Sequence, residues 1–284
     1  MPDDLAVFRV APHRIAGVPL AHTGIEDMAA FYIEQVRNRQ PLGPYLLGGL
    51  CAGGVIAYEM ALQLVRAGEV VELVTLLDAA KLKASKRRWR VTRQRFGRLK
   101  QVLADARKTK RSTIGQTRSI VAVASRKLVN ALAWEIMQHA ERLWVRARFH
   151  ILRQLLARRR PWPGFIPELS SRQIYESAEA RYVPKPLCGA SVVLVRARHH
   201  TCFLSDTPYR EIYADETLGW GAITQGLAFV DVDGGHGTML QEPFVKSLAQ
   251  ALLLHINHKC PALVPSQPNL RGEVAAKIPR FQRE

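Results

Sequence analysis

The chain alternates between short runs of consecutive apolar residues and longer stretches in which apolar positions recur every three or four residues. Short continuous runs are typical of strands that are buried on both faces of a sheet. The run at residues 190–195 is also rich in β-branched side chains, which favour strands. We predict four strands on this basis, at residues 45–48, 70–77, 190–195 and 227–232.

The longer stretches have the spacing of amphipathic helices. The predicted helices cover residues 26–39, 55–66, 170–182 and 243–255. Helices that separate buried strands indicate an α/β fold, with a mostly parallel sheet flanked by helices. In such a fold the active site lies at the carboxyl ends of the strands, so the residues that follow each predicted strand are the first candidates for chemistry.

Composition excludes several classes of protein. The 284 residues are 48% hydrophobic and 23% charged, which is typical of a folded globular chain. No apolar run approaches the roughly 18 residues needed to cross a bilayer, and the first residues do not resemble a secretory signal, so we expect a cytoplasmic protein. The cysteines form no CxxC pair, so we expect neither a metal site nor a disulfide framework. They are Cys51, Cys188, Cys202 and Cys260.

The net charge of +17 is concentrated in one segment. Residues 81–160 hold 24 of the 41 Lys and Arg residues but three of the 24 Asp and Glu residues, whereas the remaining residues carry a net charge of −4. We therefore predict a mildly acidic core that is interrupted by a basic helical insertion. The expected parts are residues 1–80 and 166–260 for the core, 81–165 for the insertion, and 261–284 for a loose tail.

A glycine-rich turn follows the first predicted strand. Its sequence, Gly49-Leu50-Cys51-Ala52-Gly53, has the pattern G-x-nucleophile-x-G, with cysteine as the nucleophile. We expect the glycines two residues to each side of Cys51 to be required, because a side chain there would collide with adjacent backbone. The amides at the start of the next helix favour a thiolate, and the amide of Ala52 can stabilise an oxyanion. The alternative is a buried cysteine beside a phosphate-binding turn, but the glycine spacing fits neither common phosphate motif.

An acid and a histidine follow in the order that this chemistry requires. Asp78 comes directly after the second predicted strand, and His236 follows the fourth in the sequence Asp233-Gly234-Gly235-His236. Asp206, on the loop after the third strand, is a competing acid. The alternatives are that Asp78 only caps the end of its strand and that His236 is an ordinary surface histidine.

Two parts of the chain resemble a known family. Residues 43–80, GPYLLGGLCAGGVIAYEMALQLVRAGEVVELVTLLDAA, and residues 234–252, GGHGTMLQEPFVKSLAQAL, resemble the thioesterase domains that end nonribosomal peptide and polyketide synthases. These domains have the α/β-hydrolase fold. The likeness covers about residues 16–80 and 172–256, and the basic insertion lies where the family has its variable lid.

The resemblance implies an activity and a role for each site residue. Cys51 would be the nucleophile, His236 the base, and Asp78 the acid, because the family places its acid at the end of the strand after the elbow. The enzyme would release an acyl or peptidyl chain from the phosphopantetheine thioester of a carrier protein, and would itself bind no cofactor. The alternatives are an acyltransferase or cyclase that uses the same acyl-enzyme, and a catalytically impaired homologue that binds carrier proteins.

The sequence departs from the family pattern at two places. Cysteine replaces the usual serine, so the intermediate would be a thioester, which amines attack readily, and aminolysis or cyclisation becomes as plausible as hydrolysis. The second departure is at the start of the chain. Residues 5–10 correspond to the strand after the loop that donates the second oxyanion amide, so we expect that donor to be missing and the sequence to be a fragment of a longer chain.

The basic insertion is the expected partner surface. Helical apolar spacing over residues 136–155 predicts several helices that fold over the elbow as a lid and bury Leu143, Val145, Phe149 and Leu152. The charge on residues 81–160 would then face outward and dock an acidic carrier protein. Nucleic acid or an anionic membrane is a less favoured partner, because no nucleic-acid motif accompanies the charge. A solvated face without a dedicated partner is the other alternative.

Overall fold

The structure is a computed structural model, and it describes residues 6–81, 114–199 and 206–259. Side chains at 114–129 and at several positions just beyond are outside that description. The predicted tail at 261–284, Cys202 and Cys260 also lie outside the described residues.

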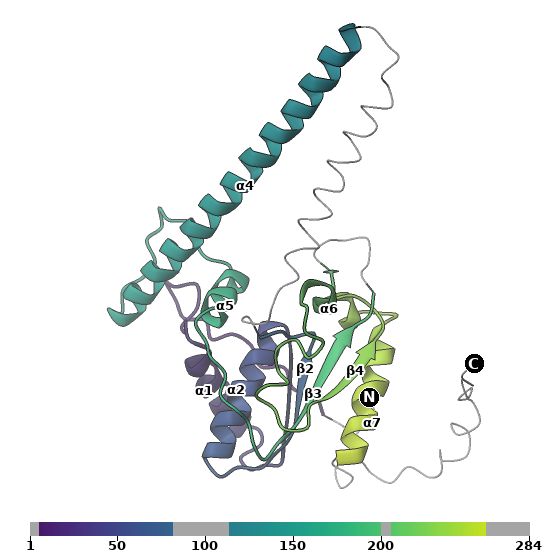
Figure 1. The fold of residues 1–284 in the computed structure, drawn as a ribbon. Helices are drawn as coiled ribbons and strands as arrows, with labels where there is room; N and C mark the ends of the chain where they lie inside the picture. Colours follow the sequence, from purple (N-terminus) through teal and green to yellow (C-terminus); the bar gives the residue numbers. More distant parts are fainter. Residues whose placement is uncertain (1–5, 82–113, 200–205, 260–284) are drawn as a thin grey trace, which may run out of the picture.

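The core is a four-stranded parallel sheet in the order β1-β2-β3-β4 (Figure 1). The four strands are those expected from the apolar runs, each within a few residues of its predicted ends. They are β1 (Tyr45–Leu50), β2 (Val71–Leu77), β3 (Ser191–Ala197) and β4 (Ala228–Val232). The predicted α/β class is therefore confirmed.

Helices cover both faces of the sheet (Figure 1). Successive side chains of a strand point to opposite faces, and β2 shows the result, because Val74 packs into the cluster on the α1 and α2 side and Leu73 into the cluster on the α7 side. The core helices are α1 (Ile25–Arg37), α2 (Ala52–Arg66), α5 (Ser171–Glu179), the single turn α6 (Tyr209–Ile212) and α7 (Val245–Lys259). They match the four predicted helices, and α6 adds a turn that the pattern did not predict.

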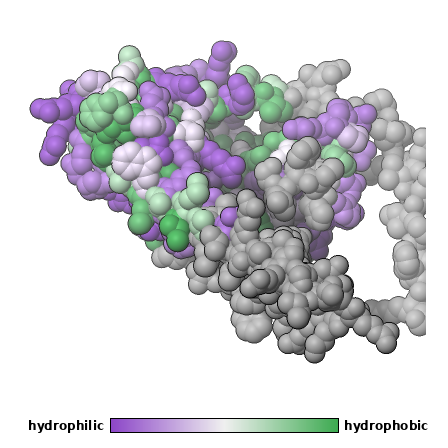
Figure 2. Space-filling view, turned by 90° about the horizontal axis from the view of Figure 1, so that it is seen from above, coloured by the Kyte–Doolittle hydropathy of each residue, from purple (hydrophilic) through white to green (hydrophobic). Residues whose placement is uncertain are grey.

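The basic insertion contributes one long helix to the described residues, α4 (Ile114–Ala157), which extends away from the core in Figure 1. Its last turns pack on the core, where Phe149 and Leu152 are buried as expected. Leu143 is 63% exposed, so its predicted burial is wrong. Figure 2 views the molecule from above, relative to Figure 1, and shows hydrophobic residues intermixed with hydrophilic ones on the described surface. The other helices predicted for the insertion would fall on residues 82–113, outside the described residues.

The strand expected at residues 5–10 is not formed by the part of it that the structure describes. Residues 6–10 have no regular secondary structure, and Val7 and Phe8 are about 70% exposed. A strand needs a neighbour to satisfy its backbone hydrogen bonds, and β1 pairs only with β2 in the described sheet. Among the described residues, no helix is both long and apolar enough to cross a membrane.

Candidate active site

Cys51 occupies the sharp turn between β1 and α2, at the carboxyl edge of the sheet. Its backbone has φ 54° and ψ −123°, a conformation that is strained for a residue with a side chain. The turn is held to the next strand because the Cys51 N–H donates to the Leu77 carbonyl at 3.0 Å. Ala52 is the first residue of α2, so its N–H has no acceptor within the helix. The turn thus presents a thiol beside a free helix terminus.

Two glycines make this turn possible, but they are Gly49 and Gly54 rather than the expected pair, Gly49 and Gly53. A Cβ on Gly49 would overlap the backbone of Gly53, and a Cβ on Gly54 would lie 2.7 Å from the Ala79 Cβ and 2.8 Å from the Gly49 oxygen. A Cβ on Gly53 would meet nothing within 4 Å. The expectation that a side chain at position 53 would collide is therefore wrong, because the crowding falls on the inner side of the turn.

The imidazole of His236 lies against the carboxylate of Asp78. The distance from Nδ1 to Oδ2 is 2.8 Å, and Cys51 is near enough to act on the charge of the same imidazole. Asp78 is fully buried at the end of β2, and it also accepts the Tyr209 N–H at 3.0 Å and the Ala197 N–H at 3.4 Å. The structure therefore brings together Cys51, His236 and Asp78, from three separate segments of the sequence.

Opposing effects act on the charge of His236. Burial lowers its pKa, but hydrogen bonds to Asp78 and Cys51, together with the charges of these two groups, outweigh burial and raise the pKa from 6.5 to about 9. The protonated imidazole is consequently favoured at neutral pH.

Asp206 binds the backbone of the loop that carries His236, and it does not bind the His236 ring. The buried carboxylate accepts the Gly237 N–H at 2.6 Å, the Thr238 N–H at 3.0 Å and the Thr238 hydroxyl at 2.7 Å. Its backbone carbonyl accepts the His236 N–H at 3.0 Å. A Cβ on Gly235 would overlap this carboxylate, so the glycine leaves room for it. Of the two candidate acids, the structure places Asp78 against the imidazole.

Tyr209 is a site residue that the sequence did not predict. Its hydroxyl lies 3.0 Å from the Cys51 Sγ, and its ring stacks on the His236 imidazole with centroids 4.4 Å apart and planes 18° apart. With the bond from its N–H to Asp78, it contacts all three residues. No motif surrounds Tyr209 in the sequence. The one available signal was its place, on the segment that follows the third strand, twelve residues after Ala197.

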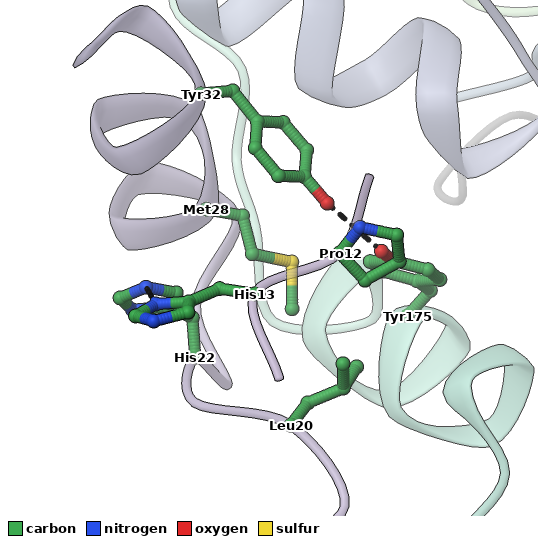
Figure 3. Close-up of a pocket in the computed structure, with 7 residues that line it drawn as sticks. All are labelled: Pro12, His13, Leu20, His22, Met28, Tyr32 and Tyr175. Atoms are coloured by element: carbon green, nitrogen blue, oxygen red, sulfur yellow. Dashed lines mark hydrogen bonds between the residues drawn. The ribbon is translucent and has the colours of Figure 1, made fainter. Parts of the chain in front are cut away.

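A small cavity is lined by a different set of residues. It lies between the N-terminal segment, α1 and α5 and has a volume of about 10 Å³, enough for about one water molecule (Figure 3). In it, the rings of His13 and His22 hydrogen-bond at 3.0 Å, as do the hydroxyls of Tyr32 and Tyr175. No cluster of three or more potential metal ligands occurs among the described residues.

Comparison with known proteins places the chain in a family. A family model for the thioesterase domain matches residues 2–252. Among curated proteins, the chain is 46% identical over 76 residues to the non-reducing polyketide synthase Preu8 of Preussia isomera, and 53% identical over 57 residues to the non-reducing polyketide synthase terA of Aspergillus terreus. These matches cover 27% and 20% of the chain but 4% and 3% of the synthases, so the chain spans a small fraction of those proteins.

Solved structures include similar domains at lower identity. The NocB thioesterase domain from the nocardicin cluster is 21% identical, over 86% of this chain and 76% of that one, with a TM-score of 0.44. The SrfTE thioesterase domain, which cyclises the lipopeptide antibiotic surfactin, is 18% identical, over 82% of this chain and 76% of that one, with a TM-score of 0.42.

The parallel sheet and the family match define an enzyme of the α/β-hydrolase class that acts on thioesters. The chain belongs to the thioesterase domain family. The resemblance to the thioesterase domains of polyketide and nonribosomal peptide synthases is thereby confirmed.

Proposed function

We propose that the protein releases an acyl or peptidyl chain from the phosphopantetheine thioester of a carrier protein, with Cys51 as nucleophile, His236 as base and Asp78 as the acid that orients the base. The observation that carries the proposal is the 2.8 Å contact between His236 Nδ1 and Asp78 Oδ2, next to Cys51, whose charge acts on the same imidazole. Because Asp78 accepts at Nδ1, it fixes the ring with Nε2 free for the nucleophile.

The proposed reaction has two halves. In the first, the Cys51 thiolate attacks the thioester carbonyl, and the resulting oxyanion is stabilised by the Ala52 N–H. The carbon–sulfur bond to phosphopantetheine breaks, and the departing thiolate takes a proton from the His236 imidazolium. In the second half, His236 removes a proton from water, the water oxygen attacks the acyl-enzyme, and Cys51 leaves as a thiolate. The free acid is released and His236 is protonated again.

An amine or hydroxyl of the bound chain can replace the water. The acyl-enzyme on Cys51 is a thioester, which amines attack more readily than an ester, so aminolysis or cyclisation is the second candidate outcome. The identity of residue 51 is the observation that favours it. Phosphopantetheine arrives with the carrier, so the proposal requires no cofactor bound by this chain.

We place the carrier on the groove between α4 and α5. The groove has a volume of about 670 Å³, and Val145 and Phe149 contribute its apolar lining. Two glutamates, Glu141 and Glu176, also line it but are outnumbered by arginines. These arginines are Arg142, Arg146, Arg153 and Arg181. Net positive charge suits an acidic carrier protein or the phosphate of its phosphopantetheine arm.

Charge reversal tests this placement. The double variant Arg142→Glu, Arg146→Glu should raise the KM for a carrier-bound acyl substrate about tenfold or more, because repulsion weakens the encounter. The KM for a free acyl-pantetheine thioester should stay within about twofold. An equal change for both substrates would argue against carrier docking at this groove.

Covalent capture tests the proposed chemistry. The protein is incubated with an acyl-pantetheine thioester and its intact mass is measured, alongside Cys51→Ala and the control Cys188→Ala, which removes an exposed cysteine elsewhere. We expect a mass gain of one acyl group in the wild type and in Cys188→Ala, and none in Cys51→Ala. A folded wild-type protein that gains no mass and releases no acid would contradict the proposal.

A further inference from the structure

Tyr209 is the point at which the elbow, the acid and the histidine meet. It begins the short helix α6, and its backbone N–H and side chain both face the site. Its hydroxyl is 3.0 Å from Sγ of Cys51, and its ring lies parallel to the imidazole of His236. A side chain that merely filled space would not need the hydroxyl to point at the sulfur.

The direction of the O–H···S bond depends on the ionisation of both partners. Burial, reinforced by the nearby Cys51 charge and hydrogen bond, raises the pKa of Tyr209 far above its ordinary value. The phenol therefore keeps its proton at every pH at which the protein works. Because a thiolate has no proton to give, the hydroxyl must be the donor whenever Cys51 is ionised.

The aromatic ring of Tyr209 acts on His236. The face of an aromatic ring is negative, and it attracts a cation placed over it. The imidazolium of His236 stacks on this face at 4.4 Å, whereas a neutral imidazole gains less from the contact. One side chain thus favours the charged form of both the nucleophile and the base.

We propose that Tyr209 is a further catalytic residue, which stabilises the Cys51 thiolate with its hydroxyl and the His236 imidazolium with its ring. This inference rests on the proposed role of Cys51 as the nucleophile. In the reaction, the hydroxyl donates to the attacking thiolate, is released as the sulfur becomes acylated and loses its charge, and donates again when the thiolate leaves. No bond to Tyr209 is formed or broken.

The experiment measures thiolate formation without any acyl substrate. The rate of alkylation of Cys51 by iodoacetamide is measured from pH 5 to pH 10, by mass spectrometry of the peptide that contains it, for wild type, Tyr209→Phe and Tyr175→Phe. Tyr175→Phe is the matched control, because its hydroxyl also makes a 3.0 Å bond, but to Tyr32. Other groups whose charges act here, Arg172 and Glu179, are the same in every variant.

We expect Tyr209→Phe to move the midpoint of the profile up by about one pH unit and to lower the rate about tenfold at pH values well below the wild-type midpoint, the low end for a hydrogen bond to a charged group. The rates should converge at high pH, and Tyr175→Phe should match the wild type. An unmoved midpoint, or an equal fall at every pH, would overturn the inference. If Tyr209→Phe does not fold by circular dichroism, Tyr209→Leu takes its place, and an unmoved midpoint there would overturn it as well.

The two proposals can fail separately. A shifted alkylation profile in a protein that no acyl thioester acylates would leave Tyr209 in its role and reject the proposed function. Acylation of Cys51 together with an unshifted profile would reject the role of Tyr209 alone.

Discussion

The elbow at Cys51 and the loop of residues 206–209 supply the same site, but they are held in different ways. The elbow is held by backbone, because Gly49 and Gly54 allow two segments to touch and Cys51 takes a strained φ of 54°. The loop is held mainly by a side chain, since the Asp206 carboxylate accepts three hydrogen bonds from the histidine loop, in addition to the one that the Asp206 backbone carbonyl accepts.

The difference decides what a substitution can do in each region. Backbone contact leaves no room for relaxation, so a single methyl group at the wrong position must distort the turn or unfold it. A side-chain hydrogen bond can be lost while the surrounding backbone stays folded, so damage to the loop should appear first in the position of His236. The elbow should therefore fail through stability and the loop through activity.

The largest effect is expected at Gly49. Gly49→Ala would place a methyl group on the backbone of Gly53, and we expect the free energy of unfolding to fall by about 3 kcal/mol. The measurement is chemical denaturation, with alkylation of Cys51 as a check on the elbow. A variant as stable as the wild type would show that the turn can relax, and would remove the basis of the contrast with the loop.

The next effect is expected at Asp206. Asp206→Ala leaves the N–H groups of Gly237 and Thr238 without their acceptor, and we expect a loss of about 2 kcal/mol of stability and at least a tenfold loss of kcat.

The chain offers a matched control for Asp206. Asp215 accepts the Thr217 N–H, the Thr217 hydroxyl and the Gly219 N–H, but these bonds stay within its own exposed loop. Asp215→Ala removes as many hydrogen bonds and should leave kcat within about twofold. Equal losses of kcat in the two variants would mean that Asp206 acts through general stability rather than through the histidine loop.

A more gradual effect, spread over several pH units, concerns pH, because His236 connects the two regions. The pKa of His236 is about 9 in the folded protein, and the ordinary value of 6.5 applies to the unfolded chain. Between pH 6.5 and pH 9 the folded protein therefore binds more protons than the unfolded chain. The resulting stabilisation is complete below pH 6.5 and is lost as the pH rises through 9, by at most about 1.4 kcal/mol per pH unit.

Unfolding curves between pH 6 and pH 10 measure how the free energy of unfolding depends on pH. The slope should disappear in His236→Gln and persist in His255→Gln, whose ring bonds the Ala251 carbonyl on α7. A slope that survives in His236→Gln would assign it to another group.

The smallest effect is expected at Gly53 and has the opposite sign. Gly53→Ala adds a methyl group into open space in the first turn of α2, where alanine favours a helix more than glycine does. We expect a gain of up to about 1 kcal/mol in the free energy of unfolding. If Gly53→Ala and Gly49→Ala destabilise equally, the crowding is not one-sided as the structure indicates.

The contrast between the two regions also explains what the sequence could predict. The strands and the elbow follow from local patterns, and Asp78 and His236 follow from their places after strands. Tyr209 could not be found in this way, because its hydroxyl reaches a sulfur 158 positions earlier and only the folded sheet brings them together. The role of Asp206 was hidden for the same reason, since an acid after the third strand fits either a catalytic or a structural role until its partners are known.

The exposure of the apolar face of α4 could not be predicted from the local sequence pattern either. Helical spacing predicted that Leu143 would be buried, yet Leu143 and Trp144 are 63% and 47% exposed, as are Ile136 and Met137 at 69% each. Periodicity shows that residues share a face of a helix, but it does not show what that face meets.

The length of α4 has a consequence for how the molecule moves in solution. At 1.5 Å per residue, its 44 residues extend about 66 Å, whereas a compact chain of 284 residues has a radius of gyration of about 19 Å. A rod of that length fixed to a small globule increases hydrodynamic drag and makes rotational diffusion anisotropic. The protein should therefore elute from a sizing column ahead of a globular protein of equal mass, even as a monomer.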